Sequence, residues 1–205
     1  MKRIVLMALL ALALPLAAFA GNIDFSNAGG TLSGSSAGLT LGSTGSRLIS
    51  VQGLGLDTCS SASPCGTVTF TTGALTSGNL STGAMFAAGG TFVITGNGTD
   101  GLPNGVIFNG TFSSAVSWTP SGKVGVDGTI LYTLSGSITG TYNGHTVDGA
   151  TIQITFNTGK NGFIESATLG SGDTVISPVP EPGTLGLLGT GLVGLAGVVR
   201  RKLKA

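Results

Sequence analysis

Apolar and polar residues alternate with a period of two along much of the chain between residues 66 and 169. Val68 and Phe70 alternate with threonines, and Phe92 and Ile94 alternate with Thr91, Val93 and Thr95. The same alternation sets Ile152, Ile154 and Phe156 against Thr151, Gln153 and Thr155. Because successive side chains of a strand point to opposite faces, the pattern predicts strands with one apolar face, which we expect to be buried.

Further runs at 106–113, 115–119, 129–135, 137–142 and 163–169 are rich in β-branched and aromatic residues, which favours strands. Residues 22–66 are rich in glycine and serine and predict only short strands. None of residues 21–178 carries a helical apolar stripe. Asn-Gly and Asp-Gly dipeptides at 97–98, 100–101, 104–105, 127–128, 143–144, 148–149 and 161–162 predict tight turns. Asn109-Gly110 interrupts a run and predicts a bulge.

These local connections predict an all-β, antiparallel domain, a β-sandwich or jelly roll of about eight to ten strands. A β-solenoid is the alternative. It is less favoured because the Gly-Thr pairs at 66, 90, 110, 128 and 140 follow no fixed period.

The first twenty residues have the organisation of a secretory signal peptide. Lys2 and Arg3 form a basic start, residues 4–14 are apolar, and Ala18 and Ala20 form a small-x-small cleavage site. Cleavage is expected after Ala20, leaving Gly21 as the new N-terminus. An uncleaved membrane helix is the less favoured alternative, because the apolar run is short.

The C-terminus combines three signals: Val179, Pro180, Glu181 and Pro182, then an uncharged run at 183–199, then the basic residues Arg200, Arg201, Lys202 and Lys204. The run predicts a transmembrane helix whose basic end stays in the cytoplasm. Residues 179–204 resemble the PEP-CTERM sorting signal of exported bacterial proteins. That resemblance implies export through the inner membrane, recognition by exosortase, a membrane-embedded protease, and release to the cell surface, outer membrane or extracellular matrix. An ordinary tail anchor is the alternative, and it does not require Pro-Glu-Pro.

The chain therefore divides into a signal peptide at 1–20, an ectodomain at 21–178 and a sorting signal at 179–205. The ectodomain has three basic and seven acidic residues, a net charge of −4. Its cations are Arg47, Lys123 and Lys160. Three scattered cations make no phosphate-binding surface, so nucleic acid is not an expected partner.

Cys59 and Cys65 bracket a short polar loop. In an exported chain they are expected to form a disulfide. Metal binding competes with this hypothesis, but two cysteines without a neighbouring histidine fall short of a structural zinc site.

Two glycine-rich motifs have weak claims to function. Residues 34–38 fit G-x-S-x-G, for which His145 would be the base, but no helix is predicted to follow as a nucleophile elbow requires. Residues 96–101 fit G-x-G-x-x-G, but Pro103 follows where a phosphate-binding helix should begin. The sequence nominates no catalytic residue, no cofactor and no metal ligand.

Trp118, Tyr132 and Tyr142 are amphipathic aromatics that can stack on a sugar or pack in a core. We expect an exported, non-catalytic structural or adhesive protein of the cell surface or of a biofilm matrix. The alternative is a carbohydrate-binding module for extracellular polysaccharide, a ligand class that the resemblance implies. A hydrolase ranks third, because no spacing nominates a carboxylate pair.

Overall fold

The computed structural model describes residues 21–42, 44–53, 59–60, 62–124, 129–157, 162–163 and 165–178. Thirteen strands lie in this part of the chain. They are β1 (Ile23–Ala28), β2 (Thr31–Ser35), β3 (Gly38–Leu41), β4 (Ser46–Gln52), β5 (Gly66–Thr71), β6 (Leu75–Asn79), β7 (Gly83–Phe86), β8 (Gly89–Asn97), β9 (Asn104–Phe112), β10 (Val116–Val124), β11 (Thr129–Tyr142), β12 (His145–Asn157) and β13 (Ser166–Pro178).

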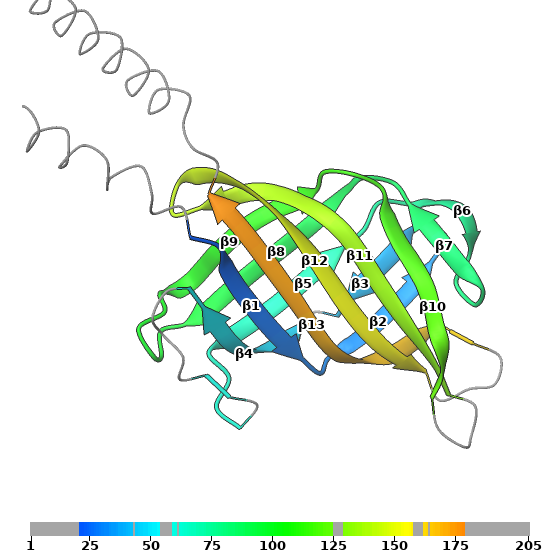
Figure 1. The fold of residues 1–205 in the computed structure, drawn as a ribbon, viewed down its shortest axis with the longest axis horizontal. Helices are drawn as coiled ribbons and strands as arrows, with labels where there is room; N and C mark the ends of the chain where they lie inside the picture. Colours follow the sequence, from blue (N-terminus) through cyan, green and yellow to red (C-terminus); the bar gives the residue numbers. More distant parts are fainter. Residues whose placement is uncertain are drawn as a thin grey trace, which may run out of the picture. The chain divides into compact units, whose positions relative to one another are not determined.

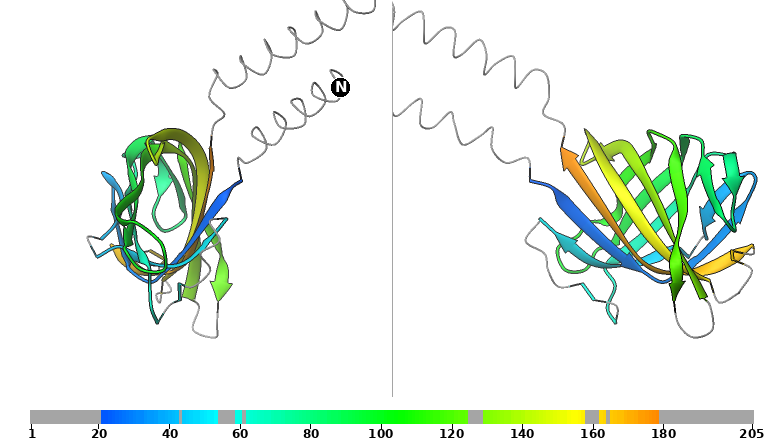
Figure 2. Two further views of the ribbon diagram at one scale, coloured as in Figure 1. Left: turned by 90° about the vertical axis from the view of Figure 1, so that its left-hand side faces the viewer. Right: turned by 45° about the vertical axis from the view of Figure 1, so that its right-hand side comes forward.

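Eight of these strands close into a ring in the order β1-β4-β5-β8-β9-β11-β12-β13, and β13 pairs again with β1. Figure 1 shows β1 and β13 side by side, and the views in Figure 2 show the strands curling around a common interior. The all-β, antiparallel prediction is confirmed. The architecture is a closed barrel with additional strands, however, and not the predicted sandwich or jelly roll.

The long-range pairing of β1 with β13 explains this difference. Ile23 lies opposite Ile176 and Phe25 opposite Thr174. A sandwich keeps two separate sheets with free edges, whereas this pairing joins the two ends of the domain and leaves β1 and β13 without a free edge. Dipeptide turns and alternation are local signals. They could not reveal that Ile23 pairs with Ile176, which lies 153 positions further along the chain.

Two hairpins extend the ring. β2 and β3 pair with each other and bridge β13 to β5, while β7 adds β6 to the free side of β10. The chain leaves β1 for β2 through Gly29 and Gly30, whose φ angles of 74° and 94° favour glycine. Both hairpins fall where the sequence predicted few or no strands.

Local turn predictions succeeded where two residues join adjacent strands. Asn143-Gly144 forms such a hairpin, with φ angles of 49° and 80°, between Tyr142 and His145. By contrast, Asp148-Gly149 lies inside β12, paired with Thr139 and Ile138, so the turn predicted there is wrong.

The bulge prediction also needs correction. Asn109-Gly110 keeps a regular register with β11, and the irregularity in β9 lies between Phe108 and Val106 instead. Gly110 and Gly140 face each other, and a Cβ on either would crowd the Phe108 ring. The glycines therefore make room for an aromatic side chain.

The interior holds two aromatic groups. Phe70, Phe92, Phe108 and Phe112 interlock through one stacked and three edge contacts, with ring centroids 5.8–6.2 Å apart. Trp118, Tyr132 and Phe163 form the second group. Their burial fixes the inward faces of β5, β8, β9, β10 and β11.

Strand β12 alternates as predicted, but with the opposite face inward. Thr151, Gln153 and Thr155 are buried, whereas Ile152 is 50% exposed. The expectation that the apolar face is the buried one is therefore wrong for this strand. Of the three inward polar side chains, Thr151 and Gln153 are held by hydrogen bonds within the barrel.

Gln153 is the centre of that buried network. Its Nε2 donates to Thr151 Oγ1 at 2.9 Å, and its Oε1 accepts from Asn27 Nδ2 at 2.9 Å. Asn27 Nδ2 also donates to Ser46 Oγ at 2.8 Å, and Thr151 and Thr174 hydroxyls lie 2.9 Å apart. Since buried polar groups are tolerated when they are hydrogen-bonded, these bonds allow β12 to turn its polar face inward.

None of the described residues belongs to a helix with the length and hydropathy needed to cross a bilayer. The predicted transmembrane run at 183–199 lies outside the described residues.

Candidate functional site

The disulfide predicted between Cys59 and Cys65 is present, with the two Cα atoms 5.5 Å apart. Cys65 is fully buried, and Cys59 is half-buried against the core. Within the loop, Ser60 N donates to Ser63 O at 3.1 Å, and Ser63 N donates to Ser60 Oγ at 3.1 Å. The disulfide therefore closes a turn that is itself hydrogen-bonded.

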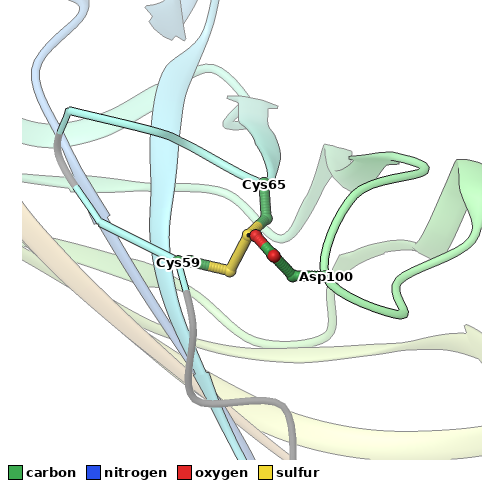
Figure 3. Close-up of side chains that lie close together, drawn as sticks. All are labelled: Cys59, Cys65 and Asp100. Atoms are coloured by element: carbon green, nitrogen blue, oxygen red, sulfur yellow. Dashed lines mark hydrogen bonds between the residues drawn. A yellow bond between two sulfur atoms is a disulfide. The ribbon is translucent and has the colours of Figure 1, made fainter.

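Asp100 approaches this disulfide from the β8–β9 turn, 35 residues along the chain. Its Oδ2 lies 3.2 Å from Cys65 Sγ (Figure 3). A disulfide sulfur carries no proton and cannot donate a hydrogen bond. The carboxylate oxygen of Asp100 is therefore in contact with the sulfur of Cys65 without a hydrogen bond between them. No sequence spacing pointed to this neighbour.

Hydrogen bonds hold the β8–β9 turn against the disulfide loop. Asn97 N donates to Cys65 O, and Asn97 Nδ2 donates to Pro64 O, both at 2.9 Å. Leu102, two residues after Asp100, is buried and donates its N–H to Thr99 O at 3.0 Å. The position of Asp100 is thus fixed from both sides of the contact.

Cys59, Cys65 and Asp100 place two sulfurs and a carboxylate oxygen within 4.8 Å of one another. A thiolate is the form of cysteine that binds metals, and the disulfide holds both sulfurs in another form. The three residues therefore do not make a metal site in this oxidised state.

Trp118 and Tyr132, two of the three predicted sugar-stacking residues, stack on each other inside the core. Their ring centroids are 4.8 Å apart with an interplanar angle of 4°, and both rings are almost fully buried. Trp118 Nε1 donates to Leu80 O at 2.9 Å, and Tyr132 Oη donates to Ser81 O at 2.8 Å. Because both faces are covered and both polar atoms are bonded, neither ring offers a face for sugar stacking.

A shallow hollow of about 260 Å³ lies above Trp118, on β6, β7 and β10. Trp118, Pro120 and Met85 are the large apolar residues among those that line it. Ser77, Thr82 and Thr119 contribute hydroxyls, and no lining residue is charged. The hollow therefore suits a neutral ligand better than an ionic one.

Tyr142, the third predicted stacking residue, lies far from the other two. It is ten residues beyond Tyr132 on the same strand, roughly 33 Å away at about 3.3 Å per residue. It is half-buried, and this burial raises the pKa of its phenol, which a hydrogen bond with Asn143 partly offsets. The three aromatics thus do not form one surface.

The two glycine-rich motifs form hairpins. Residues 34–38 join β2 to β3, with Ser35 opposite Gly38, and residues 96–101 lie at the β8–β9 connection. His145 is exposed at the start of β12. None of these places has the strand–turn–helix junction that the motifs require.

One pair of acids lies close together on neighbouring strands. Burial, and then the negative charge of Asp173, raise the pKa of Asp24 above its ordinary 3.8. Asp173 Oδ1 accepts a hydrogen bond from Ser26 Oγ at 2.7 Å. Both acids lie on the outer faces of β1 and β13, and neither lines the hollow above Trp118.

The remaining predicted residues are terminal. Gly21 is the first described residue, whereas Ala18, Ala20, Val179, Pro180, Glu181, Pro182 and the basic residues Arg200, Arg201, Lys202 and Lys204 lie outside the described residues. Sequence reasoning missed Asp100, Phe163 and the hydroxyls of the hollow. Of these residues, only Asp100 stood in a recognisable sequence pattern, the turn dipeptide Asp100-Gly101.

Residues 178–202 match the family described as the PEP-CTERM protein-sorting motif. The match confirms the C-terminal signal predicted from Pro-Glu-Pro, the apolar run and the basic end. It implies export, processing by exosortase and sorting to the cell envelope or surface. No curated protein sequence and no solved structure matches the chain.

Proposed function

We propose that this protein is delivered by exosortase to the cell surface or extracellular matrix, where its barrel has a structural or adhesive role without catalysis. The observation that carries the proposal is the sorting motif at 178–202, which begins where the last strand, β13, ends. What sorting would deliver is therefore the barrel of residues 22–177, which forms one compact unit.

The outer face of the barrel supports a structural or adhesive role. Hydroxyls of Thr67 and Thr95 lie 2.6 Å apart across β5 and β8. The Ser121 and Thr133 hydroxyls lie 2.6 Å apart across β10 and β11. Such cross-strand pairs stabilise a sheet while presenting an uncharged, hydrated surface, which suits a hydrated matrix.

Processing is tested by mapping the C-terminal peptides of the surface fraction by mass spectrometry, in cells with and without exosortase. Wild-type cells should yield no peptide from 183–199, and replacing Pro180, Glu181 and Pro182 together by alanine should leave a full-length form at the inner membrane. Thr184→Ala with Thr190→Ala is the matched control and should be processed normally. Persistence of the 183–199 peptides in surface protein would refute sorting.

The structural or adhesive role is tested separately by deleting the gene and measuring cell aggregation and matrix retention. A deletion strain should lose attachment, and the wild-type chain should restore it. Unchanged attachment in the deletion strain would refute the role while leaving the sorting result untouched.

The hollow above Trp118 favours carbohydrate binding as a second candidate function. Its uncharged lining and three hydroxyls match the chemistry of a neutral sugar. Thr82→Ala with Thr119→Ala should weaken retention of the exported protein on the cells' own polysaccharide. Ser121→Ala, outside the hollow, is the control. Equal retention of all variants would exclude this hollow as the site.

A further inference from the structure

We propose that Asp100 protects the Cys59–Cys65 disulfide from thiol reductants by holding a negative charge against Cys65 Sγ. This inference goes beyond the proposed function, because it concerns how long the covalent link survives whatever the barrel does at the surface. It rests on the 3.2 Å contact between Asp100 Oδ2 and Cys65 Sγ (Figure 3).

Burial decides which sulfur a reductant attacks. Cys65 is fully buried, whereas Cys59 is half-buried. A thiolate therefore attacks Cys59 Sγ, forms a mixed disulfide there, and breaks the bond to Cys65, whose sulfur leaves with the electron pair. A second thiolate of the reductant then attacks the mixed disulfide. The protein gains two thiols, and the reductant leaves as its own disulfide.

The first of these steps places negative charge beside Asp100. In the transition state the charge of the attacking thiolate spreads over three sulfurs, and Cys65 Sγ, the leaving end, lies against the carboxylate. Repulsion between unit charges at about 4 Å, even with the dielectric constant of water, corresponds to about a fivefold change in rate. The same charge also opposes the approach of an anionic reductant.

The turn geometry keeps the carboxylate in place. Asp100 has φ of 54°, and Asn97 and Leu102 tie the turn to the disulfide loop and to the core. Asparagine accepts this left-handed conformation as readily as aspartate does. Asp100→Asn should therefore remove the charge and retain the turn.

The experiment measures reduction of the exported protein, purified from cells, by cysteamine, 2-mercaptoethanol and mercaptoethanesulfonate, with rates expressed per thiolate. These reductants carry a positive, a neutral and a negative group beside the thiolate. Asp100→Asn should be reduced about fivefold faster than wild type by the sulfonate and about twofold faster by cysteamine. Asp148→Asn, an exposed acid on β12 with the same charge change, should match wild type.

Two results would overturn the proposal. Equal rates for Asp100→Asn and wild type would show that the charge has no effect. An acceleration that is identical for all three reductants and unaffected by salt would show that the substitution merely loosens the turn, because repulsion at Cys65 Sγ and repulsion of an anionic reductant are both electrostatic. If the Asp100→Asn variant fails to fold, the wild-type protein is tested alone. Added salt must then reduce the difference between its rates of reduction by cysteamine and by mercaptoethanesulfonate. An unchanged difference in rate rejects the electrostatic mechanism.

Discussion

The two sides of the barrel interior are built from opposite chemistry. On β5, β8 and β9, Phe70, Phe92, Phe108 and Phe112 pack ring against ring. On β1, β12 and β13 the inward positions include Asn27, Gln153, Thr151 and Thr174, joined by hydrogen bonds. Apolar packing does not depend on the direction of individual contacts. Hydrogen bonds do, so the polar side is stable only while each donor faces an acceptor. An inward face is therefore not the same as an apolar face.

The largest effect should come from the aromatic side. Phe92→Ala removes a ring that touches three other phenylalanines, and it should lower the free energy of unfolding by about 3–5 kcal/mol. Chemical denaturation of the purified ectodomain measures this loss. Val93→Ala, one residue along on the outer face, is the control, and an equal loss there would contradict the packing argument.

Gln153→Leu tests the polar side and should cost about 2 kcal/mol, because Asn27 Oδ1 loses its partner in the barrel interior. The sharper test is the double variant Asn27→Leu with Gln153→Leu. Replacing both partners by apolar groups should cost clearly less than the sum of the single losses. Additive losses in denaturation would mean that the network does not act as a unit.

Thr155→Val should stabilise the domain by about 1 kcal/mol. Thr155 is buried, and its Oγ1 has no hydrogen-bond partner within the described structure, whereas its neighbour on the same face, Thr151, is bonded. Valine keeps the shape and removes the unsatisfied hydroxyl. Thr151→Val is the matched control and should destabilise instead. The midpoint of thermal unfolding distinguishes the two signs, and a loss of stability in Thr155→Val would refute the explanation.

The smallest effect is expected on the outer face, at Asp24. Its raised pKa means that the folded state holds the proton more tightly than the unfolded state, so ionisation destabilises the fold. The penalty is absent below the ordinary pKa and fully present above the raised one. Asp24→Asn should therefore stabilise the domain by a few tenths of a kcal/mol at about pH 7 and have no effect near pH 3. A gain of equal size at both pH values would contradict the linkage.

What could be predicted from the sequence was local. The alternation at 66–71 and the Asn143-Gly144 hairpin depend on neighbours in the chain, and both appear in the structure as predicted. The barrel closure and the contact between Asp100 and Cys65 join distant segments, so no local pattern encodes them. The reversal of β12 has a similar cause. Gln153 is accommodated because its partner Asn27 lies on β1, on the other side of β13, and because residue 172 of β13, beside the Gln153 side chain, is glycine.

The pairing of β1 with β13 imposes an order of events. An exported chain that emerges with its N-terminus first releases β1 at the start and β13 at the end, and the ring stays open between these two moments. Contacts between residues so far apart in the sequence form slowly. Until they form, the unpaired edges of β1 and β13 can mispair with other strands. Because the sorting motif begins where β13 ends, the segment that signals for cleavage emerges just after the segment that completes the fold. Cleavage requires the motif, and the motif follows β13 in the chain. Cleavage therefore occurs only after every strand of the barrel has been exported.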